Sequence, residues 1–253
     1  MITYILQPGD NLLTLAQMYH TTVEEIVAAN PSIGPYNLFV GQIISIPAAR
    51  QHKPIAPHHP GHSTHHTKCG PGCVSKAELD LNSFMRVLWE EHIAWTRMVI
   101  ISITFKLPDV DFVIKRLLQN ATNMGAAFKK YYGEQIGAKF AALIKDHLVI
   151  AAQLVKAAAA GDSKGADMEE KRWYANAAEI ADFLNKINPA NWPKDAVNEM
   201  MKHHLRLTKS EAVYMITKDY ASDVAIYDEI EKQALEMADA FTNGIIKQFP
   251  HLF

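Results

Sequence analysis

The chain has 253 residues, of which 49% are hydrophobic and 21% are charged, and its formal net charge is −2. This near-neutral balance excludes a protein that binds nucleic acid or an anionic membrane mainly through its net charge. A membrane span needs roughly 18 consecutive apolar side chains, and no run in the sequence is that long, since the apolar stretch 98–104 lies between Arg97 and Lys106. The length predicts two domains.

The first residues predict a strand followed by a helix. Residues 2–7 are rich in β-branched and aromatic side chains, and they end at the turn sequence Pro8-Gly9. Asp10 suits the N-cap of a helix, because its carboxylate can accept from a free N–H group of the first turn. From Leu12 to Tyr19 the apolar residues recur at helical spacing.

A second helix and a second strand are predicted next. Thr21 or Thr22 can cap a short helix that has Glu25 in its first turn, where the helix dipole favours negative charge. Asn30-Pro31 ends this helix, since the residue before proline avoids helical dihedral angles. Residues 42–46 then alternate as in a half-buried strand. The predicted order is β-α-α-β.

Residues 2–47 resemble a LysM domain, a small glycan-binding module of cell-wall proteins. The resemblance rests on Gln7-Pro8-Gly9-Asp10 with Leu12, on Asn30-Pro31, and on the closing segments 38–42 and 44–47, which read Leu-Phe-Val-Gly-Gln and Ile-Ser-Ile-Pro. Two positions depart from the family pattern. Asn11 stands where Thr or Ser is usual, and Leu13 stands where many members have a tryptophan or another bulky residue.

The resemblance implies binding to glycans that contain N-acetylglucosamine, such as peptidoglycan and chitin. It implies a groove between the loop after the first strand and the loop before the second. In that groove, backbone amides would contact the acetamido group and small side chains would pack on the sugar ring. The residues implied are Gly9, Asp10, Asn11 and Leu12 on one wall and Asn30, Pro31, Ser32 and Ile33 on the other. An alternative is that Asp10 is only a helix cap and Asn30-Pro31 only a helix stop.

Residues 49–75 predict a linker between the domain 1–48 and the domain 76–253. They contain six of the 12 histidines and four prolines, a composition that cannot form a packed core. The segment ends in Cys69-Gly70-Pro71-Gly72-Cys73, which holds both cysteines of the chain. Because a Gly-Pro-Gly turn would let the two sulfurs approach each other, the alternatives are a local disulfide, a cross-link between chains, and a soft-metal site with nearby imidazoles. A fourth alternative is a spacer that has no specific ligand.

The remainder predicts an all-α bundle of about six helices. Residues 75–253 are rich in Ala, Leu, Met, Glu and Lys, and Pro and Gly occur at intervals that delimit helices. Asp109 can cap the second helix, and residues 188–193, Asn-Pro-Ala-Asn-Trp-Pro, form a turn. The predicted helices span 76–105, 109–131, 134–160, 164–187, 194–217 and 219–247. The fold class is therefore multidomain, a βααβ LysM-like domain followed by a helical bundle.

Several polar residues fall on helix faces that should be buried. One hypothesis is a metal site inside the bundle, as in ferritin-like proteins, with His92, His147, His204, Glu91 and Asp223 as its ligands and Glu211 nearby. Ferritin-like sites have a Glu-x-x-His pattern on each of two helices, and the sequence does not contain this pair of motifs. Glu199 and His203 are four residues apart instead. The alternative is that these residues hydrogen-bond to one another, as buried polar groups must.

A weak internal repeat also occurs in the helical region. Residues 145–148, Lys-Asp-His-Leu, are similar to residues 202–205, Lys-His-His-Leu. Residues 89–92, Trp-Glu-Glu-His, pair more loosely with residues 173–176, Trp-Tyr-Ala-Asn. These pairs suggest a duplicated helical hairpin.

No basic region, apolar core or cleavage site of a secretion signal precedes the first strand. LysM domains without such a signal are familiar in spore-coat proteins of Gram-positive spore formers, and the helical region resembles a domain that accompanies LysM modules in these bacteria. We therefore expect a non-enzymatic protein, made in the cytoplasm, that anchors the bundle to the cell wall or spore surface. Its expected partners are the glycan and either coat proteins or further copies of the chain, with no nucleic acid and no membrane span. The alternative is a ferritin-like metal-binding or enzymatic bundle targeted to the wall.

Overall fold

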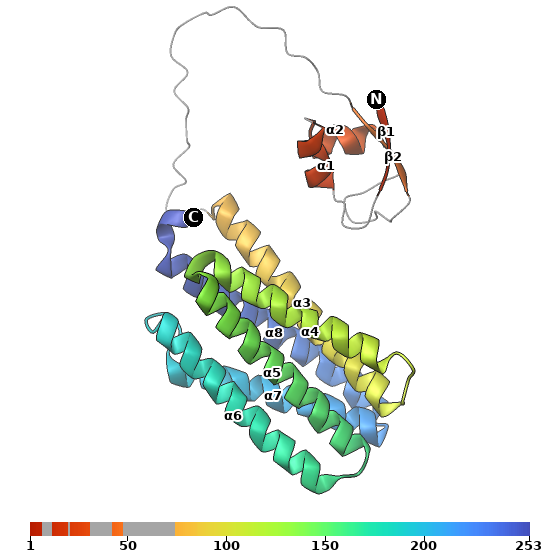
Figure 1. Cartoon of the computed structure of the whole chain (residues 1–253), viewed down its shortest axis with the longest axis vertical. Helices are drawn as coiled ribbons and strands as arrows, with labels where there is room; N and C mark the ends of the chain where they lie inside the picture. Colours follow the sequence, from red (N-terminus) through yellow and green to blue (C-terminus); the bar gives the residue numbers. More distant parts are fainter. Residues whose placement is uncertain (7–11, 20, 31–41, 48–73) are drawn as a thin grey trace, which may run out of the picture. The chain divides into compact units, whose positions relative to one another are not determined.

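A computed structural model describes residues 1–6, 12–19, 21–30, 42–47 and 74–253 (Figure 1). The chain divides into two compact units, one at each end of the sequence. Of the predicted linker 49–75, only positions 74 and 75 are among the described residues. The boundaries of the linker stay a prediction.

The N-terminal unit has the predicted β-α-α-β order. Its elements are β1 (Ile2–Ile5), α1 (Leu12–Met18), α2 (Val23–Ala28) and β2 (Ile43–Ile46). The two strands pair antiparallel, with Ile2 opposite Ile46 and Ile5 opposite Ile43. Helix α2 begins at a capping box, in which the Thr22 side chain accepts from the Glu25 N–H and the Glu25 carboxylate accepts from the Thr22 N–H. The core consists of Leu6, Leu12, Leu15, Ala16, Ile26, Ile44 and Ile46.

The C-terminal unit is a bundle of six helices, as predicted. They are α3 (Lys76–Thr104), α4 (Val110–Tyr132), α5 (Glu134–Ala159), α6 (Ser163–Ile187), α7 (Lys194–Thr217) and α8 (Tyr220–Gln248). Helix α3 begins at a capping box formed by Ser75 and Glu78. The predicted side-chain cap at Asp109 is wrong, because Asp109 holds the N-cap position of α4 without a capping hydrogen bond. Asp162 and Asp219 do cap α6 and α8.

Each helix packs against the next one in the chain, and α8 returns to pack against α3 (Figure 1). Asp239 on α8 strengthens this closing contact, since it accepts from Asn82 at 2.7 Å and from both Nε and Nη2 of Arg86 on α3. The turn between α6 and α7 places the Trp192 indole directly on Gly244 of α8, where a Cβ atom would lie only 2.1 Å from Nε1. The bundle therefore consists of three successive helical hairpins, α3–α4, α5–α6 and α7–α8, around one core.

Candidate functional site

In the N-terminal unit, Asn30 ties the end of α2 to β2. Its Nδ2 group donates to the carbonyl oxygens of Ile26 at 2.6 Å and Ser45 at 2.7 Å, and its Oδ1 accepts from the Ser45 N–H at 2.7 Å. Leu12 is part of the core and only 4% exposed. Both described residues of the predicted groove thus have structural roles. The other six predicted groove residues lie outside the described residues: Gly9, Asp10, Asn11, Pro31, Ser32 and Ile33.

Replacing Asn30 by Ala is expected to loosen the N-terminal unit. The change removes three hydrogen bonds and leaves polar groups of Ile26 and Ser45 without this partner, at a cost of about 2–3 kcal/mol. Amide hydrogen exchange at Ser45, measured by NMR on the full chain, should accelerate about 30-fold or more. Asn30→Asp is the matched control. It keeps the acceptor and loses both donors, so its effect should be intermediate. Unchanged exchange in Asn30→Ala would contradict the structural role.

In the helical unit, the three predicted histidines occupy the same place in three hairpins. His92, His147 and His204 lie on α3, α5 and α7, and all are at least 93% buried. Each Nδ1 atom lies 2.9–3.2 Å from the side-chain amide oxygen of a residue 28 or 29 positions later, on the second helix of the same hairpin. These amides belong to Asn120, Asn176 and Gln233.

The amide groups are themselves fixed, and this determines the state of each imidazole. Each amide nitrogen donates to the backbone carbonyl four residues before the histidine, that is, to Leu88, Leu143 or Met200. The amide oxygen must therefore face the imidazole, so Nδ1–H is the donor and Nε2 holds the lone pair. Trp173 agrees with this assignment, because its indole N–H donates to Nε2 of His147 at 3.1 Å.

Burial keeps these three imidazoles neutral. It lowers the pKa of His92 to about 4 and, together with the charge that His92 would carry, the pKa of His147 to about 3. The pKa of His204 is also held well below its ordinary value, mainly by burial. The rings of His92 and His204 lie 5.5 Å apart and those of His147 and His204 lie 6.1 Å apart, around a cavity of about 30 Å³. Such a cavity has room for one water molecule.

The structure does not bring the five predicted metal ligands together. Glu91 pairs with Arg116 at 3.1 Å, and Asp223 pairs with Arg97 at 2.5 Å. Among residues 74–253 and the other described segments, no group of three His, Cys, Asp or Glu side chains could hold a metal ion. Cys69 and Cys73, predicted as a disulfide or cross-link, lie outside the described residues.

Arg97, which no sequence pattern had indicated, forms the centre of a buried charge cluster. Its guanidinium donates to Glu211 at 2.6 Å and to both carboxylate oxygens of Asp223, while it lies 4.9 Å above the Tyr227 ring. Both carboxylates are almost fully buried, at 1% and 2% exposed. Burial, helped by the nearby Asp223 charge, outweighs the lowering effect of Arg97 and raises the pKa of Glu211 to about 7.

The repeated hairpins also correct the repeat suggested by the sequence. His147 and His204 are equivalent, so the similarity of residues 145–148 to 202–205 agrees with the hydrogen bonds. The pairing of residues 89–92 with 173–176 is wrong, because His92 is equivalent to His147 and Asn176 is equivalent to Asn120. The unit contains three related hairpins, where the sequence suggested two.

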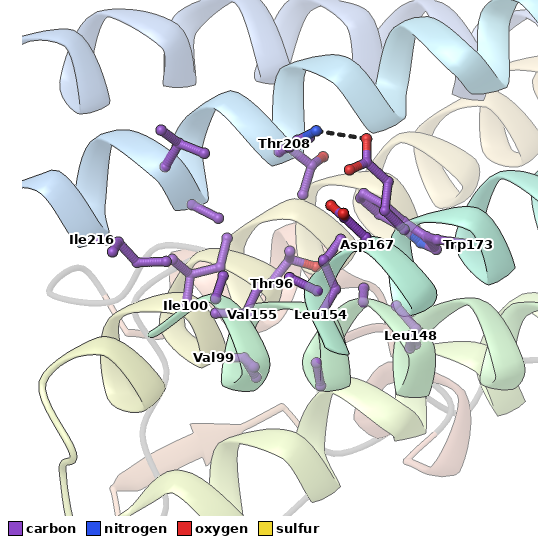
Figure 2. A pocket seen from close by; sticks show the side chains of 18 of the residues that line it. Thr96, Val99, Ile100, Leu148, Leu154, Val155, Asp167, Trp173, Thr208 and Ile216 are labelled. Atoms are coloured by element: carbon purple, nitrogen blue, oxygen red, sulfur yellow. Dashed lines mark hydrogen bonds and ion pairs between the residues drawn. The ribbon is translucent and has the colours of Figure 1, made fainter. Parts of the chain in front are cut away.

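The helical unit has a larger pocket of about 330 Å³ between α3, α5, α6 and α7 (Figure 2). Its wall is mostly apolar, and Trp173, only 2% exposed, lies in it. Asp167, Glu170 and Lys209 also line the pocket, and Lys209 donates to Glu170 at 2.6 Å. Five alanines contribute to the wall: Ala151, Ala152, Ala158, Ala166 and Ala212.

Comparison with protein families gives one result, a match of the LysM domain model to residues 4–47. The N-terminal unit is thus a LysM domain, and a six-helix bundle follows it. A LysM domain implies binding to peptidoglycan or chitin and association with the cell wall. Comparisons with curated proteins and with solved structures found no match to the chain. None of the helices in the described residues is both long enough and apolar enough to cross a membrane.

Proposed function

We propose that this protein is a non-enzymatic anchor, whose LysM domain holds the helical bundle on N-acetylglucosamine-containing glycan at the cell wall or spore surface. The observation that carries the proposal is the LysM match over residues 4–47 together with the β-α-α-β fold of that segment. In this proposal the LysM domain binds the glycan, and the bundle binds other coat proteins or further copies of the chain.

The polar groups inside the bundle support binding in preference to catalysis. Each buried histidine has its Nδ1–H group fixed by an amide, and each amide is fixed by a backbone carbonyl. Arg97 engages the buried carboxylates of Glu211 and Asp223. Each histidine–amide contact joins the two helices of one hairpin, and the Arg97 contacts join α3 to α7 and α8. Holding helices together is the role expected of buried polar groups that all have partners.

A sedimentation assay on insoluble peptidoglycan tests the anchor. The full chain is expected to co-sediment, and soluble N-acetylglucosamine oligomers should compete with it. A chain that lacks residues 1–47 should lose most of the binding, and so should Asn30→Ala, which loosens the LysM fold without shortening the chain. Binding that survives both changes would remove the basis of the proposal. A peptidoglycan zymogram of the full chain should show no lysis, and a cleared band would establish the enzymatic alternative.

The spore-surface part of the proposal needs its own test. In a sporulating Gram-positive host, a fluorescent fusion of the full chain is expected to collect around the forespore, and Asn30→Ala should stay diffuse in the mother cell. An even distribution of the unchanged chain in both cells would restrict the proposal to the cell wall.

A further inference from the structure

We propose that the pocket between α3, α5, α6 and α7 binds a small amphiphile, whose apolar body fills the pocket and whose single ammonium group pairs with Asp167. This inference concerns the bundle and does not depend on glycan binding by the LysM domain.

The size and lining of the pocket define the body of the ligand. A volume of about 330 Å³ is at the lower end of small-molecule sites, so the pocket fits one short alkyl chain or one or two rings. The wall is formed by alanines and by larger aliphatic side chains such as Val155 and Ile216. Because the alanines are too short to fill the space between the helices, an apolar ligand would gain contacts there that the protein does not make with itself.

The charges at the pocket define the head group. Asp167 and Glu170 are three residues apart on α6, so they lie on the same face of that helix. Lys209 on α7 already pairs with Glu170 at 2.6 Å. Asp167 has no hydrogen bond or ion pair within the described residues, and it is exposed at the rim. Figure 2 shows its carboxylate in the space between α6 and α7. Asp167, Glu170 and Lys209 are the charged residues that line the pocket, and together they carry a net charge of −1, which favours a cationic head group over an anionic one.

Trp173 gives the pocket a built-in reporter. Its indole lines the pocket, and its N–H is held by Nε2 of His147 at 3.1 Å. A ligand that displaces water from the pocket changes the surroundings of this ring, so binding should change the fluorescence of the full chain. A Trp173→Phe chain should lose this signal, whereas a signal from a ligand near the partly exposed Trp95 would persist.

The test is a fluorescence titration of the full chain with octylammonium, octanol and octanoate, which share one chain and differ in the head group. Octylammonium is expected to bind about three- to fivefold more tightly than octanol, the gain of one exposed ion pair. Octanoate should bind more weakly than octanol, because its carboxylate faces Asp167. Calorimetry on the same samples confirms that the signal reports binding, and circular dichroism confirms that the helices stay folded.

Two variants distinguish the contribution of the ligand's head group to binding from that of its apolar body. Asp167→Asn should remove the preference for octylammonium and leave octanol binding unchanged. Its matched control is Asp228→Asn, a change of another exposed aspartate on α8, which should keep the preference. Ala212→Leu fills part of the pocket and should weaken all three probes about tenfold or more, since each buried methylene contributes about 0.8 kcal/mol.

The proposal is overturned if no probe gives a saturable signal, or if Ala212→Leu binds as the unchanged chain does. Equal binding of octylammonium and octanoate, or tighter binding of octanoate, overturns the assignment of the head group. If Ala212→Leu fails to fold, Ala152→Leu replaces it, because Ala152 lines the same pocket from α5.

Discussion

Lowering the pH from about 7.5 to about 5 is expected to destabilise the helical domain by about 3–4 kcal/mol. In the unfolded chain each histidine takes up a proton below about pH 6.5. In the folded domain His92 and His147 resist protonation until the pH reaches about 4 and about 3. The stability is therefore complete above pH 6.5 and is lost progressively as the pH falls from 6.5 towards the folded pKa values, a window that includes pH 5.

The size of the effect follows from four groups. At pH 5 each of the three buried histidines costs about 2 kcal/mol, which together is about 6 kcal/mol. Glu211 acts in the opposite direction, because its raised pKa of about 7 lets the folded domain bind a proton that the unfolded chain does not bind at pH 5. The proton on Glu211 offsets about 2–3 kcal/mol of the histidine cost. The net change is therefore still a loss of stability at pH 5. A loss of this size is a large part of the stability of an ordinary domain.

Urea unfolding of the full chain at both pH values, followed by helical circular dichroism, measures the effect. His204→Gln removes one buried titrating group, so it should reduce the pH dependence by about 2 kcal/mol. The matched control is His203→Gln at the neighbouring exposed position, which should change the pH dependence far less than His204→Gln. Equal stability at both pH values in the unchanged chain would contradict the prediction.

Replacing Arg97 by Met is expected to cost about 3–5 kcal/mol at pH 8, since it leaves Glu211 and Asp223 buried without their cation. The cost should shrink towards pH 6, because a proton on Glu211 then removes one of the two negative charges. Urea unfolding at the two pH values measures both the size and the pH dependence of the loss.

Arg86→Met is the matched control for this change. Arg86 also pairs two helices through an aspartate, but the two side chains are 45% and 34% exposed, so its loss should cost about 1 kcal/mol or less. Glu211→Gln in the Arg97→Met background should restore part of the lost stability, since it removes one uncompensated charge. If the two arginine variants lose equal stability, the buried cluster contributes no more to the free energy of unfolding than an exposed ion pair does.

The helices of the bundle could be predicted closely from the sequence. The breaks at residues 188–193 and at 161–163 are local, because proline, glycine and capping residues act on the backbone beside them. The structure places α7 at Lys194–Thr217, with the predicted bounds. The LysM domain was predictable for the same reason, since its turns and strand ends are coded by short motifs within 50 residues.

The partners of the buried polar residues could not be predicted in this way. The sequence singled out His92, His147 and His204, but it did not indicate that Asn120, Asn176 and Gln233 are their partners. An amide on a helix gives no sign of which way it faces. The sequence does hold one indication of these partners, an interval of 28 or 29 residues between each histidine and its amide. The interval can be recognised only after the three pairs have been identified in the structure.

The sequence by itself determined the LysM domain, its glycan class and the extent of the six helices, because each depends on residues close together in the chain. Only the tertiary structure decided what the buried groups do. It fixed the histidines through amides on the next helix, paired Glu211 and Asp223 with Arg97 more than 100 residues away, and left a pocket where alanines from three helices meet. Such contacts depend on how the helices pack across the bundle. A pattern of residues that are close together in the sequence therefore does not predict them.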